Sequence, residues 1–124
     1  DSNNWGEDNG VSQLLVYDIE TGKGNEALPG SGLVVRYRGY LEDGTKISTD
    51  EEENIPLSFT LGRGEVISGW EKGLVGMREG GLRRLIIPSE EALGEYALVD
   101  RSGKVIIPPN TALIYEVFLM SVSR

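Results

Sequence analysis

The sequence contains no cysteine and no histidine. Disulfide bonds, thiolate zinc sites, cysteine nucleophiles and Ser-His-Asp triads are therefore excluded. Carboxylates, hydroxyls, lysine amines and apolar surface remain for any chemistry. The chain also lacks an apolar run of about eighteen residues, so we expect no membrane span.

Basic residues are few, because twelve lysines and arginines stand against twenty aspartates and glutamates, which gives a formal net charge of -8. Such a surface repels phosphate backbones, so nucleic acid is not expected as a partner. The acidic run at residues 50–53 lacks the ligand spacing and central glycine of a calcium loop, and neither a metal nor a cofactor is expected. We interpret this run, Glu90 with Glu91, and Arg83 with Arg84 as solubilising surface groups.

The length of 124 residues is typical of one globular domain. Hydrophobic residues make up 39% and charged residues 26%, which are the proportions of a folded chain. We distinguish an N-terminal extension, residues 1–19, from a main domain, residues 20–124. The extension begins with a polar lead-in around Trp5, and residues 12–19 have the composition of an added strand.

Alternation with period two marks the strands of the main domain. Val35 and Tyr37 fall on one face of residues 33–41, and Arg36 and Arg38 fall on the other, as in a half-buried strand. The last strand is the longest apolar stretch and is expected to lie centrally in the sheet. Further strands are predicted at residues 57–61, 82–88 and 111–122.

One helix interrupts these strands. Val66, Ile67, Trp70, Leu74 and Met77 recur at helical spacing, and a glycine pair at residues 80–81 is expected to end the helix. Each of its three interior glycines costs about 1 kcal/mol relative to alanine, so packing against the sheet must hold it. A long loop is predicted from residue 88 to the prolines at 108–109. This order indicates an α+β fold with an antiparallel sheet.

Two local patterns allow more than one interpretation. Gly22 and Gly24 resemble a dinucleotide-binding pattern, but Pro29 follows where that pattern needs the N-terminus of a helix, so nucleotide binding is not expected. Trp70 is either a core side chain or the floor of a concavity, and its spacing alone does not decide between them.

The chain resembles the FKBP family in the segments VVRYRGYLEDG, PLSFTLGRGEVISGWEKGLVGM, GLRRLIIP and IIPPNTALIYEV. A looser segment, TGKGNEALPGSG, extends the resemblance to about residues 20–122. The resemblance implies a half-open antiparallel sheet wrapped around one short α-helix. It also implies peptidyl-prolyl cis-trans isomerisation, which needs no metal and no cofactor.

The resemblance also implies the residues of a pocket. The catalytic positions correspond to Tyr37, Ile67, Trp70 and Tyr115, where Tyr115 stands in place of the usual Phe. In the family the backbone N–H at Ile67 holds a substrate carbonyl and Trp70 lies beneath the proline ring. The substrate-binding positions correspond to Ile47, Ser48, Leu57, Phe59, Val66, Leu93 and Ile107.

Four of these positions depart from the family pattern. Ile47 stands where an aromatic residue is usual, Ser48 where Asp is usual, Leu57 where Phe is usual, and Leu93 where Tyr is usual. We therefore expect isomerisation and macrolide affinity to be lower than in a full family member by about one to three orders of magnitude. The expected partners are proline-containing polypeptides and a weakly bound macrolide.

Other interpretations stay open. The chain could be an FKBP-like protein-binding module without catalysis, or a subunit of a larger assembly, or a carrier of a small molecule in the same cavity. The compartment is equally open, because a chain without cysteine suits reducing and oxidising surroundings alike. An organelle lumen, such as that of a plastid where FKBP-like proteins occur, and the cytoplasm both fit.

Overall fold

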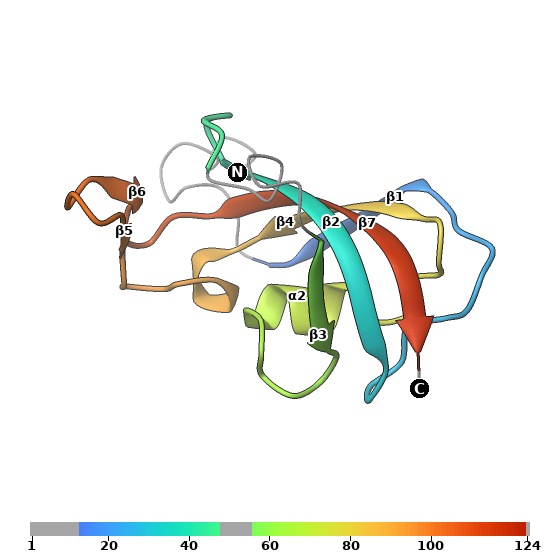
Figure 1. The fold of residues 1–124 in the computed structure, drawn as a ribbon. Helices are drawn as coiled ribbons and strands as arrows, with labels where there is room; N and C mark the ends of the chain where they lie inside the picture. The colour runs from blue at the N-terminus through green and yellow to red at the C-terminus, as the bar shows by residue number, and fades with distance from the viewer. Residues whose placement is uncertain (1–12, 48–55, 124) are drawn as a thin grey trace.

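A computed structural model of the protein describes residues 13–47 and 56–123 (Figure 1). The elements in chain order are β1 (Leu15–Glu20), β2 (Gly32–Leu41), β3 (Leu57–Thr60), α2 (Ser68–Gly73), β4 (Leu82–Ile87), the 3-10 helix η2 (Ser89–Glu91), β5 (Leu98–Val99), β6 (Val105–Ile107) and β7 (Leu113–Ser123). Five strands form one antiparallel sheet in the order β1-β4-β7-β2-β3. The predicted antiparallel sheet with one short helix is confirmed, and β7 lies in its centre as expected.

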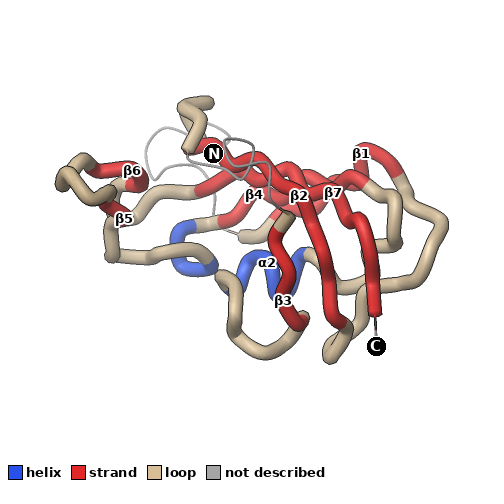
Figure 2. The backbone as a smooth tube through the Cα atoms, in the orientation of Figure 1, coloured by secondary structure: helices blue, strands red, loops and turns tan. Residues whose placement is uncertain are grey.

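The sheet curves over α2, which lies against one of its faces (Figure 2). The two long strands β2 and β7 pair along their whole length, with one register shift between Val34 and Val35. Val35 is buried and Tyr37 is half-buried on the face turned to α2, whereas Arg36 and Arg38 are exposed. The predicted alternation of this strand is therefore confirmed.

Two predictions about local structure were wrong. The helix ends at Gly73, well before the glycine pair, because Gly76 has a φ of 88° and the chain turns there. Leu74 and Met77 are buried as the spacing suggested, but they lie in the turn after the helix. The predicted long loop contains η2 and a small hairpin of β5 and β6, whose strands are too short to show alternation.

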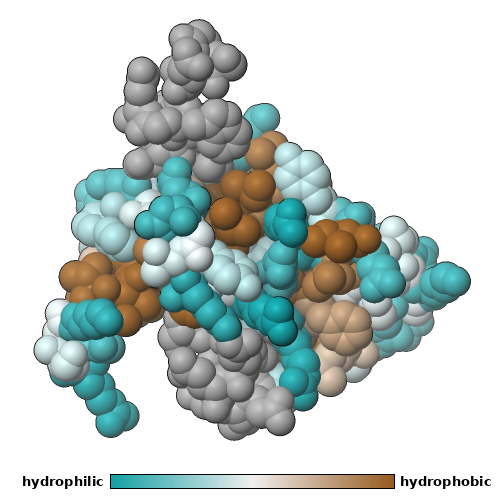
Figure 3. All heavy atoms as spheres, turned by 90° about the horizontal axis from the view of Figure 1, so that it is seen from above, coloured by the Kyte–Doolittle hydropathy of each residue, from teal (hydrophilic) through white to brown (hydrophobic). Residues whose placement is uncertain are grey.

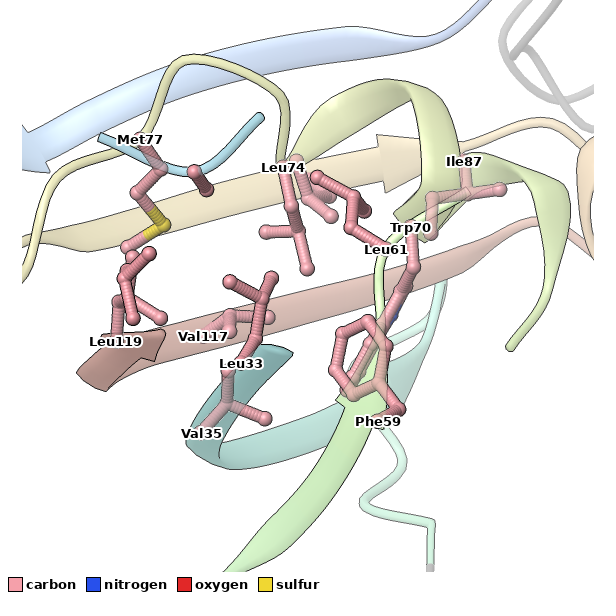
Figure 4. Packing of buried hydrophobic residues seen from close by; sticks show 13 residues of the cluster. Leu33, Val35, Phe59, Leu61, Trp70, Leu74, Met77, Ile87, Val117 and Leu119 are labelled. Atoms are coloured by element: carbon pink, nitrogen blue, oxygen red, sulfur yellow. The ribbon is translucent and has the colours of Figure 1, made fainter. Parts of the chain in front are cut away.

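The main core fills the space between α2 and the sheet (Figure 4). Two glycines let the helix approach β4 closely. A Cβ atom at Gly69 would lie 2.5 Å from Ile87 Cγ2, and one at Gly73 would lie 2.7 Å from Leu85 Cδ2. The helix backbone therefore rests directly on these two fully buried side chains.

Arg83 is a buried structural residue and not a surface group, which corrects the interpretation of the Arg83–Arg84 pair. Its guanidinium donates to both carboxylate oxygens of Asp18 in β1, at 2.7 and 3.2 Å. It also donates to the carbonyls of Gly73 and Val75, at 2.8 and 3.2 Å. A single side chain thus ties the edge strand β1 to the end of α2.

The face of the sheet turned away from α2 mixes apolar and charged side chains (Figure 3). Arg84 of β4 pairs there with Glu116 of β7 at 2.9 Å, and Phe118 is partly exposed beside them. Neither of the described segments contains a helix that is both long and apolar enough to cross a membrane.

We predict that Gly69→Ala destabilises the fold. Overpacking against Ile87 costs about 1–3 kcal/mol, which exceeds the gain of about 1 kcal/mol in helix propensity. Urea unfolding should show the loss. The double variant Gly69→Ala/Ile87→Ala should lose less stability than the sum of the two single variants, because the clash is removed. A Gly69→Ala protein as stable as the parent would contradict the close contact.

Candidate active site

Four aromatic rings meet at the start of α2. The Trp70 ring lies 5.3 Å from Tyr37 and 5.2 Å from Tyr115, in edge-to-face geometry with interplanar angles of 79° and 89°. Phe59 lies 5.9 Å from Trp70 at a tilt of 50°. These separations are typical of favourable aromatic pairs, so the cluster holds Trp70 in one orientation.

A cavity of about 160 Å³ lies over this cluster and opens to the surface. Roughly 150 Å³ suffices for benzene in an apolar protein cavity, so the space admits a ring of five or six atoms. The lining is mostly apolar. It consists of Tyr37, Leu57, Val66, Ile67, Trp70 and Tyr115.

Strands and helix each contribute to the cavity. Tyr37 comes from β2, Leu57 from β3 and Tyr115 from β7, all on the face of the sheet turned to α2. The close fit of Tyr115 depends on Gly39, where a Cβ atom would lie 2.6 Å from Tyr115 Cε1. A glycine inside a strand often marks such an approach, and this is the signal that the sequence analysis missed.

The loop between β3 and α2 positions Val66 and Ile67. The Glu71 carboxylate of α2 accepts hydrogen bonds from the backbone N–H groups of Gly62 and Gly64, the latter at 2.7 Å. Both glycines have positive φ, at 93° and 74°, which only glycine adopts readily. Sequence reasoning missed Glu71 because a carboxylate on a helix usually indicates a solvated face.

Ile67 is the residue that precedes α2. Its carbonyl accepts hydrogen bonds from Trp70 N–H at 3.0 Å and from Glu71 N–H at 3.1 Å, which starts the helix. No described residue accepts a hydrogen bond from the Ile67 N–H itself. The Val66 N–H likewise has no acceptor among the described residues, so the Ile67 and Val66 N–H groups are both left for a ligand carbonyl.

The cavity lining contains no acidic or basic side chain. Burial, and to a smaller extent the neighbouring Tyr37, raise the pKa of Tyr115 from 10.0 to about 12, so its hydroxyl stays protonated at neutral pH. The buried Trp70 Nε1 has no oxygen or nitrogen acceptor. The Trp70 ring as a whole packs against the rings of Tyr37, Phe59 and Tyr115. No cluster of metal-ligating side chains occurs in the parts of the chain that the structure describes.

The remaining candidate residues form a second layer. Phe59 packs behind Trp70 and does not line the cavity. Ile47 and Ile107 are buried in a smaller cluster against which Leu93 packs, and Ile67 and Tyr115 pack against this cluster too. Ser48 lies outside the described residues.

We predict that one tyrosine titrates near pH 12 and that Tyr115→Phe removes this step from the tyrosinate absorbance, whereas Tyr96→Phe leaves it in place. The folded pKa lies above the unfolded one, so the contribution of Tyr115 to the free energy of unfolding is fully present below pH 10 and is lost between pH 10 and 12. The expected slope relative to Tyr115→Phe is about 1.4 kcal/mol per pH unit. An unchanged high-pH step in Tyr115→Phe would contradict the buried hydroxyl.

Comparisons with known proteins agree with this geometry. The model of the FKBP-type peptidyl-prolyl cis-trans isomerase family matches residues 23–120. An FK506-binding protein of Neisseria meningitidis serogroup A is 43% identical over 112 residues, which are 90% of this chain and 98% of that protein. The human peptidyl-prolyl cis-trans isomerase FKBP2 is 43% identical over 95 residues, which are 77% of this chain and 63% of that protein.

Solved structures give the same answer. The crystal structure of AtFKBP13 matches with a TM-score of 0.80 at 33% identity, over 87% of this chain and 91% of that one. FkpA from Escherichia coli matches with a TM-score of 0.74 at 36% identity, over 89% of this chain and 48% of that one. This chain therefore belongs to the family of FKBP-type peptidyl-prolyl cis-trans isomerases.

Proposed function

We propose that the protein catalyses the cis-trans isomerisation of X-Pro bonds in polypeptides, with the cavity over Trp70 as its active site. The observation that carries the proposal is an open, apolar, aromatic-walled cavity of about 160 Å³ in a chain of this family. The cavity matches a proline ring in size and in polarity. Site residues are Tyr37, Ile67, Trp70 and Tyr115, with Leu57 and Val66 as further walls.

The mechanism needs no acid, base or covalent group. Rotation about an X-Pro bond has a barrier of about 18–20 kcal/mol because the planar amide is conjugated. At the halfway twist the carbonyl carries less charge, so transfer from water into an apolar cavity disfavours the planar form more than the twisted one. The Ile67 N–H binds a substrate carbonyl, and Trp70 supports the proline ring.

We further propose that the activity is lower than that of a full family member. The wall at Leu57 is aliphatic, and Leu93 brings no phenolic hydroxyl to the second layer. Losing one such hydrogen bond costs about 0.5–1.5 kcal/mol. Macrolides of the FK506 type, for which the bacterial relative is named, would bind the same cavity with weakened affinity.

A second function, protein binding without catalysis, is favoured by the surface of the β5–β6 hairpin. Val99 and Val105 are each 51% exposed, and Tyr96, two residues before β5, is 71% exposed. Exposed apolar side chains gathered on one hairpin are typical of a protein contact. A protein that folds but isomerises no proline peptide would support this function over the first.

We expect the purified protein to accelerate isomerisation in a short proline peptide, measured by a protease-coupled or NMR exchange assay. Trp70→Leu should abolish the acceleration because the support of the proline ring is lost. Circular dichroism of the variant must show the native spectrum for the comparison to hold. Absence of activity in the folded parent protein would refute the isomerase proposal.

The reduced activity can be tested by a gain of function. Leu57→Phe rebuilds an aromatic wall and should raise kcat/KM about two- to tenfold, since an aromatic pair contributes about 0.5–1.5 kcal/mol beyond area burial. A gain cannot arise from misfolding. Val75→Phe adds the same side chain at a position that is 42% exposed and outside the cavity lining, and it should leave kcat/KM unchanged. An unchanged rate for Leu57→Phe would contradict the proposed weak wall.

A further inference from the structure

Glu91 connects the segment after β4 to the helix that begins at the cavity. It is the last residue of η2, and its carboxylate accepts hydrogen bonds from the Ser68 hydroxyl and from Lys72 Nζ, the latter at 2.8 Å. The Ser68 hydroxyl also lies 3.3 Å from the Glu91 carbonyl oxygen. Two side chains of α2, one from its first residue, therefore hold a single residue of the loop.

The residues that follow Glu91 pack against buried residues that adjoin the cavity. Ala92 and Leu93 contact the smaller cluster around Ile107, and Ala92 also packs against the main core. Ile67, which lines the cavity, packs against both clusters as well. Ala92, Leu93 and Ile67 therefore share the smaller cluster as a common support.

In the described structure, no backbone–backbone hydrogen bond joins this segment to α2. Ala92 has φ -120° and ψ -115°, outside the regular regions. Ala92 N–H and Gly94 N–H donate to the Ser89 carbonyl, at 2.9 and 2.7 Å. Tyr96 N–H donates to the Leu93 carbonyl at 3.0 Å, and Asn110 N–H donates to the Gly94 carbonyl at 2.6 Å. The side-chain contacts of Glu91 supply the direct attachment to α2.

The charge on Glu91 supports this attachment. The hydrogen bond from Lys72, followed by that from Ser68, lowers the pKa of Glu91, so the carboxylate is ionised at neutral pH. Its side chain is 21% exposed, against 61% for Lys72. The neighbouring Glu90 is exposed and makes no such contact in the described structure.

A bound substrate extends beyond the cavity, because the cavity holds only one ring. The residue next to the proline must therefore lie on adjoining surface. The smaller cluster adjoins the cavity through Ile67 and Tyr115, and it presents Leu93 and Ile106 as partly buried side chains. It is an apolar surface that a side chain next to the proline can contact.

We propose, on the basis of the isomerase function above, that Glu91 is a positioning residue for substrate selection. By holding Ala92 and Leu93 on the smaller cluster beside the cavity, it fixes the surface that meets the residue before the proline. Glu91 touches no substrate itself. Loosening it changes which neighbouring side chains are accepted and leaves the cavity over Trp70 intact.

The test compares Glu91→Gln with the matched control Glu90→Gln on peptides that carry Gly, Ala, Leu or Phe before the proline. For Glu91→Gln we expect KM for the Leu and Phe peptides to rise about two- to fivefold, the range that an ion pair of this exposure supports, with kcat retained. The Gly peptide should be unaffected. Glu90→Gln should match the parent on all four peptides.

Lys72 provides a second test of the same contact. Lys72→Met should reproduce the selective rise in KM, and Lys72→Arg should retain the parent values because it keeps the charge and a donor. The double variant Lys72→Met/Glu91→Gln should show no further rise, since both changes remove one interaction. Amide hydrogen exchange at Ala92 and Gly94 should be faster in Glu91→Gln, while exchange in β4 stays unchanged.

Two results would overturn the inference. One is an equal loss of kcat/KM on all four peptides together with lower thermal stability, which is the sign of a merely structural role. The other is unchanged exchange and unchanged KM in Glu91→Gln. A parent protein without activity on any peptide would instead refute the isomerase function. Hydrogen exchange does not depend on activity, so it would still show whether Glu91 holds the segment at Ala92 and Gly94.

Discussion

The direct contact between the α2 backbone and β4 is the constraint on which the cavity depends. Gly69 and Gly73 have no side chains, so Ile87 and Leu85 fill the space beneath the helix. This contact fixes the height of the helix above the sheet. Trp70, which lies between the two glycines, is thereby held at the base of a cavity whose walls come from three strands.

The chemistry of the site follows from what surrounds Trp70. The protein as a whole is strongly acidic, but the cavity lining contains no ionised side chain. Two carboxylates lie outside the lining and act through the backbone around it. Glu71 accepts hydrogen bonds from the loop before α2, and Glu91 attaches the loop after β4 to α2. The charges thus position backbone and apolar groups and leave the cavity itself uncharged.

Sequence patterns predicted the long, regular strands of the sheet. Alternation at Val35 and Tyr37 identified β2, and the apolar length of the last strand identified the centre of the sheet. The end of the helix could not be predicted, because Leu74 and Met77 keep helical spacing in a chain that has already turned. Arg83 also escaped prediction, since composition treats arginine as a surface residue.

The residues around the candidate site could be predicted, but their division into lining and second layer could not. Six of the candidate residues line the cavity, but spacing could not separate them from the second layer formed by Phe59, Ile47, Leu93 and Ile107. That separation depends on side-chain direction in three dimensions. Hydrogen bonds from Ser68 and Lys72 to Glu91 join residues 19 or more positions apart, which no local pattern encodes.

The β5–β6 hairpin shares no backbone ladder with the five-stranded sheet. Its strands bond to each other between Leu98 and Ile107, and the turn between them lies outside the core. Residues added or removed in this turn would therefore leave the register of β4 and β7 untouched. The hairpin turn can therefore change in length while the five-stranded sheet that carries the cavity is preserved.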